Sequence, residues 1–244
     1  MFISYVENFY IKAMNKDLQE AIKIYATGEH KELNAFLLNK SKDGLIAIFN
    51  DLLTNYINDK NSSTLREYIT TCMCNYEHCE AKIGYNGYRQ SAISGRNEFC
   101  EVKPKNIDSR EVEKYRNKER KGKPALLNAG GNFTDYTWDR FEKDKKENPN
   151  MLISGFVDGK LIYIFEFPFN TKHFVDNLAK QLEKKFPNGI RKSNDFLRSA
   201  NFDYRNFIDS KNCKLAYVLD KKDLEKYKIY LNAKFYEVLY AKAK

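Results

Sequence analysis

The sequence predicts an α/β (α+β) fold, in which a mixed central β-sheet is flanked by helices and preceded by a helical N-terminal region. Apolar residues recur at every third or fourth position through residues 1–75, the spacing of one helix face. Two near-continuous apolar segments, 151–157 and 160–167, are joined by Asp158-Gly159, a dipeptide typical of hairpin turns. Such strands favour a central position with both faces covered. An amphipathic helical pattern follows at 173–186.

The size and composition indicate a globular protein. The 244 residues are 42% hydrophobic and 14% aromatic with only five prolines, which is enough apolar material for a core and unlike a disordered segment. We divide the chain into a helical N-terminal region, 1–75, and a mixed-sheet core with a C-terminal extension, 76–244. The two are expected to fold as one compact domain.

The net charge favours a polyanionic partner. A formal charge of +9 and a pI near 9.1 suit nucleic acid first and an anionic membrane second, although a soluble protein from a lysine-rich proteome would show the same excess. No apolar run approaches the ~20 residues that span a bilayer. The first residues lack the basic region of a signal peptide. The number of cysteines, five, is odd, which does not suggest a disulfide framework. We expect a cytoplasmic protein without a membrane partner.

The N-terminal region is expected to contain several helices. The apolar periodicity runs to a break at Gly28 and resumes after a stop at Asp43-Gly44. Residues 61–64, Asn-Ser-Ser-Thr, supply an N-cap for a last helix before the sheet.

A cysteine-rich segment comes next. Cys72-x-Cys74 and His78-Cys79 have the residue types of a zinc site. Structural zinc sites, however, use two ligand pairs that lie well apart, with two or more residues inside each pair, and Cys100 is the nearby candidate for a further ligand. We therefore favour buried thiols over zinc.

Residues 76–104 are predicted to contain a hairpin. Its tighter version pairs residues 88–93 with 98–104 through a turn at Ser94-Gly95-Arg96-Asn97. Pro104 lacks a ladder N–H, so it is expected at a strand end or edge.

Glu101 and Lys103 are the candidate catalytic residues of this hairpin. Side chains two positions apart on a strand share a face, so a carboxylate and an ammonium are expected side by side. The carboxylate can bind a divalent metal, and the ammonium can stabilise charge on a phosphate or assist deprotonation of water. Glu80-Ala81-Lys82 repeats the triplet 21 residues earlier, across a loop-rich segment, so Glu80 could fold against Glu101.

Two acids around one site, with a Lys two residues after the second, resemble the active-site pattern of the PD-(D/E)xK nucleases, the group that includes many type II restriction endonucleases. The resemblance implies that Glu80 and Glu101 bind Mg²⁺ and that Lys103 activates water. It also implies catalytic strands followed by a helix and another core strand. A helix before the catalytic strands sometimes contributes a carboxylate to the site in this family. Glu29 and Glu32 could fill that role, but we favour solvated helix charges for both.

The first acid departs from the family pattern, because no Pro-Asp precedes the triplet. In the tighter hairpin, the corresponding position falls near Gln90 or Ser91, which are poor metal ligands. Glu77, Glu80 and Glu98 are therefore all candidates for the first acid.

Polar and basic residues in the hairpin and near residue 190 are candidate DNA contacts. Arginine forms bidentate hydrogen bonds with phosphate or guanine, and Asn or Gln can pair with adenine. An ordinary surface loop has a similar composition and is the alternative interpretation. The candidates are Arg89, Gln90, Arg96, Asn97, Lys105, Arg191 and Lys192.

The stretch 108–148 is strongly charged. A capped helix is expected to begin near Asp108, and a second helix to span 134–146 with Trp138 and Phe141 facing inward. The basic run between them suits either a surface that follows a nucleic-acid backbone or a basic linker.

Three acidic or basic residues further along have open roles. Glu166 lies in the second apolar strand and could be another metal ligand, although we favour a solvent-facing Glu at a strand end. His173 and Asp176 could form an acid–base pair of a different site, although we favour a capping or surface pair. The tail is expected to contain a strand at 214–219, a short helix near 223–227 and a strand at 235–240.

The sequence therefore predicts a Mg²⁺-dependent, sequence-specific endonuclease that hydrolyses double-stranded DNA as a homodimer, in the manner that the resemblance implies. One alternative is a protein that binds DNA or RNA without catalysis, in which Glu101 and Lys103 form an ion pair on a sheet surface. Another is a metal-independent enzyme that acts on bases, similar to a DNA glycosylase.

Overall fold

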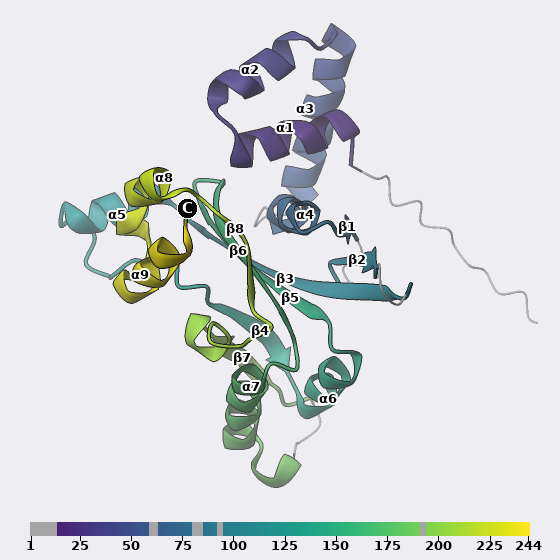
Figure 1. Cartoon of the computed structure of the whole chain (residues 1–244), viewed down its shortest axis with the longest axis vertical. Coiled ribbons are helices and arrows are strands. Elements are labelled where there is room, and N and C mark those ends of the chain that lie inside the picture. The colour runs from purple at the N-terminus through teal and green to yellow at the C-terminus, as the bar shows by residue number, and fades with distance from the viewer. Residues whose placement is uncertain (1–13, 59–62, 80–84, 92–94, 191–193) are drawn as a thin grey trace, which may run out of the picture.

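A mixed β-sheet forms the centre of the protein (Figure 1). The computed structural model describes residues 14–58, 63–79, 85–91, 95–190 and 194–244, with every side chain in these ranges except those of 54–58. In spatial order the strands are β1 (Glu77–His78), β2 (Gly87–Gln90), β3 (Asn97–Ile107), β5 (Asn150–Val157), β6 (Lys160–Pro168) and β8 (Lys214–Val218). β3 and β5 are parallel, and the other neighbours are antiparallel. The predicted mixed α/β fold class is confirmed.

The hairpin of β5 and β6 is the most buried part of the sheet, and it was predicted from the sequence. Asp158 and Gly159 have φ angles of 50° and 80°, as the favoured two-residue hairpin turn requires. Nearly every residue of both strands is buried, whichever face it points to. This explains why the two segments are apolar throughout rather than alternating.

The predicted catalytic hairpin consists of β2 and β3. The two strands pair from Gly87–Cys100 to Gln90–Asn97, after which β3 continues alone on that side to Ile107. Val102 directs its N–H to this side, where Asn86 Oδ1 accepts it at 2.7 Å. Pro104 lies two residues on, so its nitrogen faces the same side, where β2 no longer requires a ladder donor. Pro104 therefore lies at an open edge although it is inside the strand.

Four helices make up the described part of the N-terminal region: α1 (Lys16–Thr27), α2 (His30–Leu38), α3 (Lys42–Asn58) and α4 (Ser63–Met73). Asn15 caps α1 by accepting hydrogen bonds from two backbone N–H groups, and the helix ends before Gly28, as predicted. The predicted stop at Asp43-Gly44 is wrong, because both residues lie in the first turn of α3. The helical pattern predicted within 1–13 lies outside the described residues.

Different elements cover the two faces of the sheet. On one face, Val102 and Leu152 share a hydrophobic cluster with Ala26 of α1 and Ile69 of α4. On the other face, residues such as Ile153 join a larger cluster with the helices and strands that follow β3 in the sequence. Figure 1 shows the first four helices on one side of the sheet, with β4, β7, α6 and α7 on the other. The N-terminal region and the sheet thus bury a common core.

The connection between β3 and β5 contains α5 (Ser109–Arg116), β4 (Gly131–Tyr136) and α6 (Trp138–Glu147). The start of α5 after Asp108 agrees with the prediction. The helix predicted for 134–146 begins later, because residues 131–136 form an antiparallel ribbon with β7 (Leu197–Phe202) and Thr137 caps the helix. Trp138 and Phe141 face inward, as predicted.

The C-terminal part continues on the second face. It contains α7 (Lys172–Lys185), α8 (Lys221–Lys226), α9 (Ala233–Lys242) and the short 3₁₀ turns Pro187–Gly189, Tyr204–Asn206 and Lys228–Tyr230. The strand predicted at 235–240 is wrong. Asn232 caps a helix there, and the buried Phe235, Tyr236 and Leu239 follow helical spacing. Among the described residues, no helix has both the length and the apolar character needed to cross a bilayer.

The close contact between Gly155 and Tyr163 gives a test of this packing. The two residues are paired across β5 and β6, and a Cβ at position 155 would lie 2.4 Å from the fully buried Tyr163 ring. We expect Gly155→Ala to lower the free energy of unfolding by about 1–3 kcal/mol, because the ring must move in a packed core. Urea denaturation measures the change. Gly122→Ala is the control, since a Cβ at Gly122 meets nothing closer than 3.9 Å; equal losses in both variants would contradict the packing.

Candidate active site

β3 places Glu101 and Lys103 on one face of the sheet, as predicted. Lys103 Nζ lies 2.6 Å from Glu101 Oε1, and the two side chains are only 22% and 14% exposed. Their neighbours in register on β5 are Met151 and Ile153, which belong to the larger hydrophobic cluster. The ion pair therefore lies at the border of an apolar core, where charges interact more strongly than in open solvent.

Helix α6 brings a second cation and a second acid to this pair. Arg140 lies 4.0 Å from Glu101 Oε1 through one guanidinium nitrogen and 4.0 Å from Asp144 Oδ2 through another. Arg140 and Asp144 are one helical turn apart and so share a side of α6. Tyr136, in the last position of β4, donates its O–H to Asp144 at 2.9 Å. Arg140 thus connects the strand carboxylate with the helix carboxylate.

Burial alters the acid–base properties of this cluster. It raises the pKa of the Asp144 carboxyl, while the hydrogen bond from Tyr136 and the charge of Arg140 lower it, and the negative charges of Glu101 and Glu147 raise it further. Burial also raises the pKa of the Tyr136 phenol, next to the Asp144 charge. Asp144 therefore accepts a proton at a higher pH than an ordinary aspartate does.

Aromatic rings border the cluster on two sides. Tyr85 donates its O–H to Glu147 of α6, and its ring centre lies 5.6 Å from that of Phe99 on β3. Burial and the bond to Glu147 raise the pKa of the Tyr85 phenol. On the opposite side, Lys103 Nζ lies 4.8 Å above the ring centre of Phe133 on β4. A cation over an aromatic face is attracted to it, so Lys103 has two favourable partners.

The three candidates for the first acid have different outcomes. Glu80 lies outside the described residues. Glu77 pairs with Tyr88 on β2, and Tyr88 pairs with Phe99 on β3, so the Glu77 side chain is on the same face of the sheet as Glu101. Glu77 lies on the edge strand β1, however, and its carboxylate accepts the Tyr88 O–H. Glu98 lies an odd number of residues from Glu101 and faces the opposite side of the sheet. Glu98 therefore cannot share a site with Glu101.

Arg89 and Glu166 do not have the roles expected for them. Arg89, a predicted DNA contact, lies on the Glu98 face and binds both Glu98 and Glu166 at 2.9 Å. Glu166 does not face solvent. It is buried on β6, accepts the Tyr76 O–H at 2.9 Å and has no contact with Glu101. Asn150 donates to the same Tyr76 oxygen, so these residues form an internal polar network on the face opposite the candidate site.

The remaining predicted DNA contacts are dispersed. Gln90 donates to the Gly95 carbonyl, and Arg96 and Asn97 are exposed near the turn of the hairpin. Arg191 and Lys192 lie outside the described residues. Lys105 is different, because it shares the face of Glu101 and Lys103 and is half-buried.

Lys105 donates to the Leu126 carbonyl at 3.0 Å, and burial lowers the pKa of its ammonium.

The cysteine-rich segment and the His173–Asp176 pair lie elsewhere. Cys74 and Cys100 are buried thiols, and burial raises the pKa of Cys74 to about 12. His78 is partly buried, and burial lowers its pKa to about 4. His173 and Asp176 are exposed on α7. In the described ranges, no three His, Cys, Asp or Glu residues are grouped so that they could hold a metal ion.

Glu29 and Glu32, the two acids considered as a carboxylate from a preceding helix, form the capping box of α2, so their carboxylates satisfy the backbone of their own helix.

Sequence reasoning missed Arg140, Asp144 and Glu147. Their positions, 140, 144 and 147, follow the spacing of one helix face, and this is the signal that could have identified them. It was obscured because the helix was expected to start at residue 134, and because Lys and Glu are frequent throughout this stretch.

Comparisons with models of protein families and with curated proteins found no match.

The polar network around Arg89 generates a stability prediction. We expect Arg89→Met to lower the free energy of unfolding by about 2–4 kcal/mol, because the buried Glu166 carboxylate loses its cation. Urea denaturation at pH 7 measures the change. Arg198→Met is the matched control, since Arg198 is 83% exposed in its pair with Asp135 and exposed pairs contribute about 0–1 kcal/mol. A change for Arg89→Met no larger than for this control would show that Arg89 is not structural.

The raised pKa of Asp144 predicts a pH dependence. The folded state binds this proton more tightly than the unfolded state, so Asp144 favours folding at low pH and loses that contribution as the pH rises above 3.8 through its folded-state pKa. Asp144→Asn keeps an oxygen for Tyr136 but does not titrate. We therefore expect the stability of the variant relative to the wild type to increase with pH across this interval, as measured by urea denaturation. A relative stability that stays flat or decreases with pH would contradict the burial of a charged Asp144.

Proposed function

We propose that this protein is a metal-dependent endonuclease that hydrolyses phosphodiester bonds of double-stranded DNA, similar to the PD-(D/E)xK type II restriction enzymes. The observation that carries the proposal is the placement of Glu101 and Lys103 side by side on β3, facing α6. The order of elements supports it: helix α4 precedes strands β1 to β3, and a connection that contains α5, β4 and α6 then leads to core strand β5. This is the layout that the resemblance implies.

The charges of the site suit a phosphodiester. Lys103 and Arg140 both lie close to Glu101. A phosphate that enters the site can therefore form an ion pair with either cation in its present position. Arg140 is 42% exposed, and its guanidinium can fork onto two phosphate oxygens. The two cations stabilise the charge that gathers on the phosphate as water attacks phosphorus and the bond to the leaving oxygen breaks. Lys103 is also positioned to orient the attacking water or to assist its deprotonation.

Glu101 is the residue that would hold Mg²⁺. Its carboxylate oxygen is the type of ligand that Mg²⁺ prefers, and Mg²⁺ often takes only one or two protein carboxylates with water and substrate phosphate as its other ligands. Asp144 on α6 is the acid that Arg140 connects to Glu101. Bound Mg²⁺ would supply positive charge to the phosphate oxygens and lower the pKa of water.

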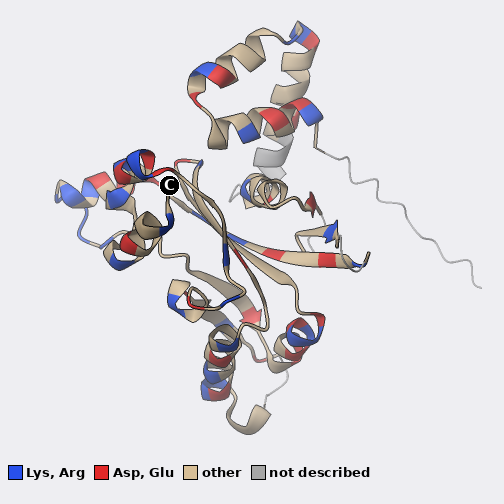
Figure 2. Ribbon diagram, in the orientation of Figure 1, with Lys and Arg blue, Asp and Glu red and all other residues tan. Residues whose placement is uncertain are grey.

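The distribution of charge supports a polyanionic substrate. The net charge is +9, and Figure 2 shows Lys and Arg residues along α5 to α9, with acidic residues between them. α6 and α7 carry basic residues in their last turns, among them Lys146 and Lys185. Sequence specificity and action as a homodimer belong to this proposal through the resemblance.

A cleavage assay tests the proposed function. The protein is incubated with mixed-sequence duplex DNA in Mg²⁺ or in EDTA, and the products are separated on a gel. We expect discrete fragments in Mg²⁺ alone, and we expect Glu101→Gln and Lys103→Met to reduce the cleavage rate about 100-fold or more while DNA binding persists. Glu98→Gln is the matched control on the opposite face of β3 and should cut at the wild-type rate.

The other outcomes decide between the alternatives. Binding to DNA without cutting in any divalent metal would favour a non-catalytic binding protein. Alkali-labile strands formed in EDTA would favour an enzyme that acts on bases. Normal cleavage by Glu101→Gln or Lys103→Met would show that the active site lies elsewhere.

A further inference from the structure

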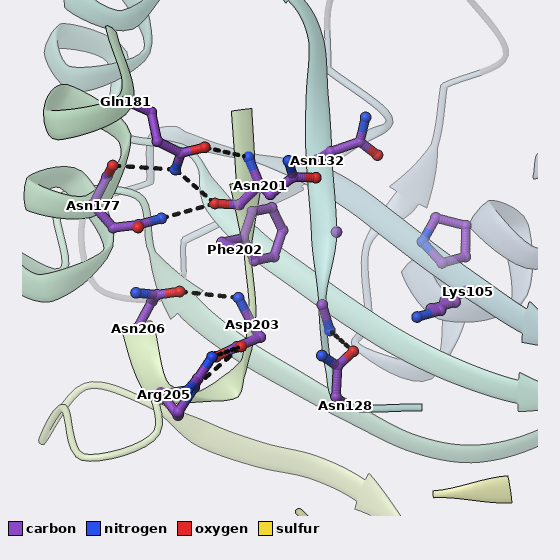
Figure 3. A pocket seen from close by; sticks show the side chains of 13 residues that line it. Lys105, Asn128, Asn132, Asn177, Gln181, Asn201, Phe202, Asp203, Arg205 and Asn206 are labelled. Carbon is purple, nitrogen blue, oxygen red and sulfur yellow. Dashed lines mark hydrogen bonds and ion pairs between the residues drawn. The ribbon is translucent and has the colours of Figure 1, made fainter. Parts of the chain in front are cut away.

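A large polar pocket adjoins the candidate active site (Figure 3). Its volume is about 950 Å³, and it is lined from β3, β4, β7 and α7. Pro104 and Lys105, the two residues after Lys103, form part of its wall. On β4, a Cβ at Gly131 would lie 3.2 Å from Lys103 Cβ. The pocket is therefore continuous with the face that carries Glu101 and Lys103.

Amide side chains dominate the pocket, and several are fixed by one hydrogen bond. Asn128 Oδ1 accepts from Gly130 N at 3.1 Å, and Asn206 Oδ1 accepts from Asp203 N at 2.9 Å. Asn132 Nδ2 donates to Ser199 Oγ at 2.9 Å, and Asn177 Nδ2 donates to the Asn201 carbonyl at 2.8 Å. Each bond sets the orientation of its amide.

The other edge of each of these amides has no partner within the part of the chain that the structure describes. Asn128 and Asn206 each keep an NH₂ group as a donor, while Asn132 and Asn177 each keep a carbonyl oxygen as an acceptor. All four side chains are half-buried and line the pocket, so their unused groups are available to a ligand that enters it. Figure 3 shows them on opposite walls. A pocket lined with fixed donors and acceptors suits a ligand with a mixed hydrogen-bonding edge.

The charges in the pocket leave one cation available. Arg205 binds both carboxylate oxygens of Asp203, at 2.6–3.1 Å, so these two charges compensate each other. Lys105 has a backbone carbonyl as its hydrogen-bond partner and no ion pair among the described residues. Its ammonium keeps two further donors. The ligand should therefore carry an anionic group next to Lys105, on the side of the pocket nearest Lys103.

Two successive glycines, Gly130 and Gly131, form part of the pocket wall where the backbone is closely packed. A Cβ at Gly130 would lie 2.7 Å from Asn128 Oδ1, and one at Gly131 would lie 2.7 Å from the Phe202 ring. The two glycines thus let β4 pass close to its neighbours.

We propose that this pocket binds one nucleotide, whose base meets the amide edges of Asn128, Asn132, Asn177 and Asn206 and whose phosphate meets Lys105. A nucleobase has donors and acceptors in fixed positions on one edge, and a nucleotide carries its anionic group at one end, as the pocket requires. The inference deepens the proposed function and rests on it in one respect: a phosphate at Lys103 would place the adjoining nucleotide of the same strand in the pocket. The four amides are then the residues that read the base.

The test measures binding in EDTA, so that cleavage plays no part. Isothermal titration calorimetry of the full chain with each of the four deoxynucleoside 5′-monophosphates is compared with titration by 2-deoxyribose 5-phosphate, which lacks the base. We expect at least one nucleotide to bind about 10-fold or more tightly than the sugar phosphate, equivalent to about 1.4 kcal/mol.

Asn128→Asp and Asn206→Asp identify the amide edges. Each variant keeps the oxygen that accepts the backbone N–H and replaces the free donor with an acceptor. We expect each to lower nucleotide affinity about 10-fold more than it lowers sugar-phosphate affinity, because the added charge affects both probes and the lost donor affects only the base. Asn232→Asp is the matched control, since Asn232 caps α9 through the same oxygen and lies outside the pocket.

The results separate this inference from the proposed function. Equal affinities for nucleotides and sugar phosphate, or parallel losses for both probes in the two pocket variants, would overturn the nucleotide pocket even if the protein cleaves DNA. Nucleotide binding that depends on Asn128 and Asn206 would support the pocket even if no DNA is cleaved, in which case the proposed nuclease activity fails alone.

Discussion

The alternation of side chains along β3 is the constraint on which the rest of the structure depends. Cys100 and Val102 face α4 and are buried in an apolar cluster, which fixes the register of the strand. Glu101, Lys103 and Lys105 must then point to the opposite face. A shift of one residue would bury the ionic side chains under α4 and expose the apolar ones. The apolar packing on one side therefore determines the chemistry on the other.

The internal ion pairs beneath the sheet have a complementary role. Arg89 on β2 and Glu166 on β6 belong to strands that are not neighbours, yet their side chains meet at 2.9 Å, with the Arg89 guanidinium 4.2 Å from the centre of the Tyr76 ring. This network ties the short edge hairpin to the centre of the sheet. Arg89 thus joins β2 to β6, and β2 in turn pairs with the beginning of β3.

The sequence was sufficient to predict those parts of the structure that a local pattern of residues determines. The β5–β6 hairpin follows from Asp158-Gly159 between two apolar segments, and the Glu101–Lys103 pair follows from strand alternation alone. Prediction was wrong or incomplete where residues far apart in the sequence determine the secondary structure or the role of a side chain. Arg89 looks like a surface arginine unless Glu166 is known to lie beside it, and β4 looks like the start of a helix unless β7 is known to pair with it. Residues 235–240 have strand-forming side chains, but the cap at Asn232 and the buried helical face of Phe235 and Leu239 favour α9.

The ribbon of β4 and β7 explains why the ion pair and the polar pocket are neighbours. The Phe133 ring lies 4.8 Å from the Lys103 ammonium, a Cβ at Gly131 would lie 3.2 Å from Lys103 Cβ, and Asn132 between them lines the pocket. Because successive side chains of a strand face opposite sides, one short strand can pack a ring against the core and present an amide to a ligand. A displacement of β4 would alter both the position of Lys103 and the walls of the pocket. If the two sites act on one DNA strand, their geometric coupling through β4 joins recognition of a nucleotide to the position of the phosphate beside it.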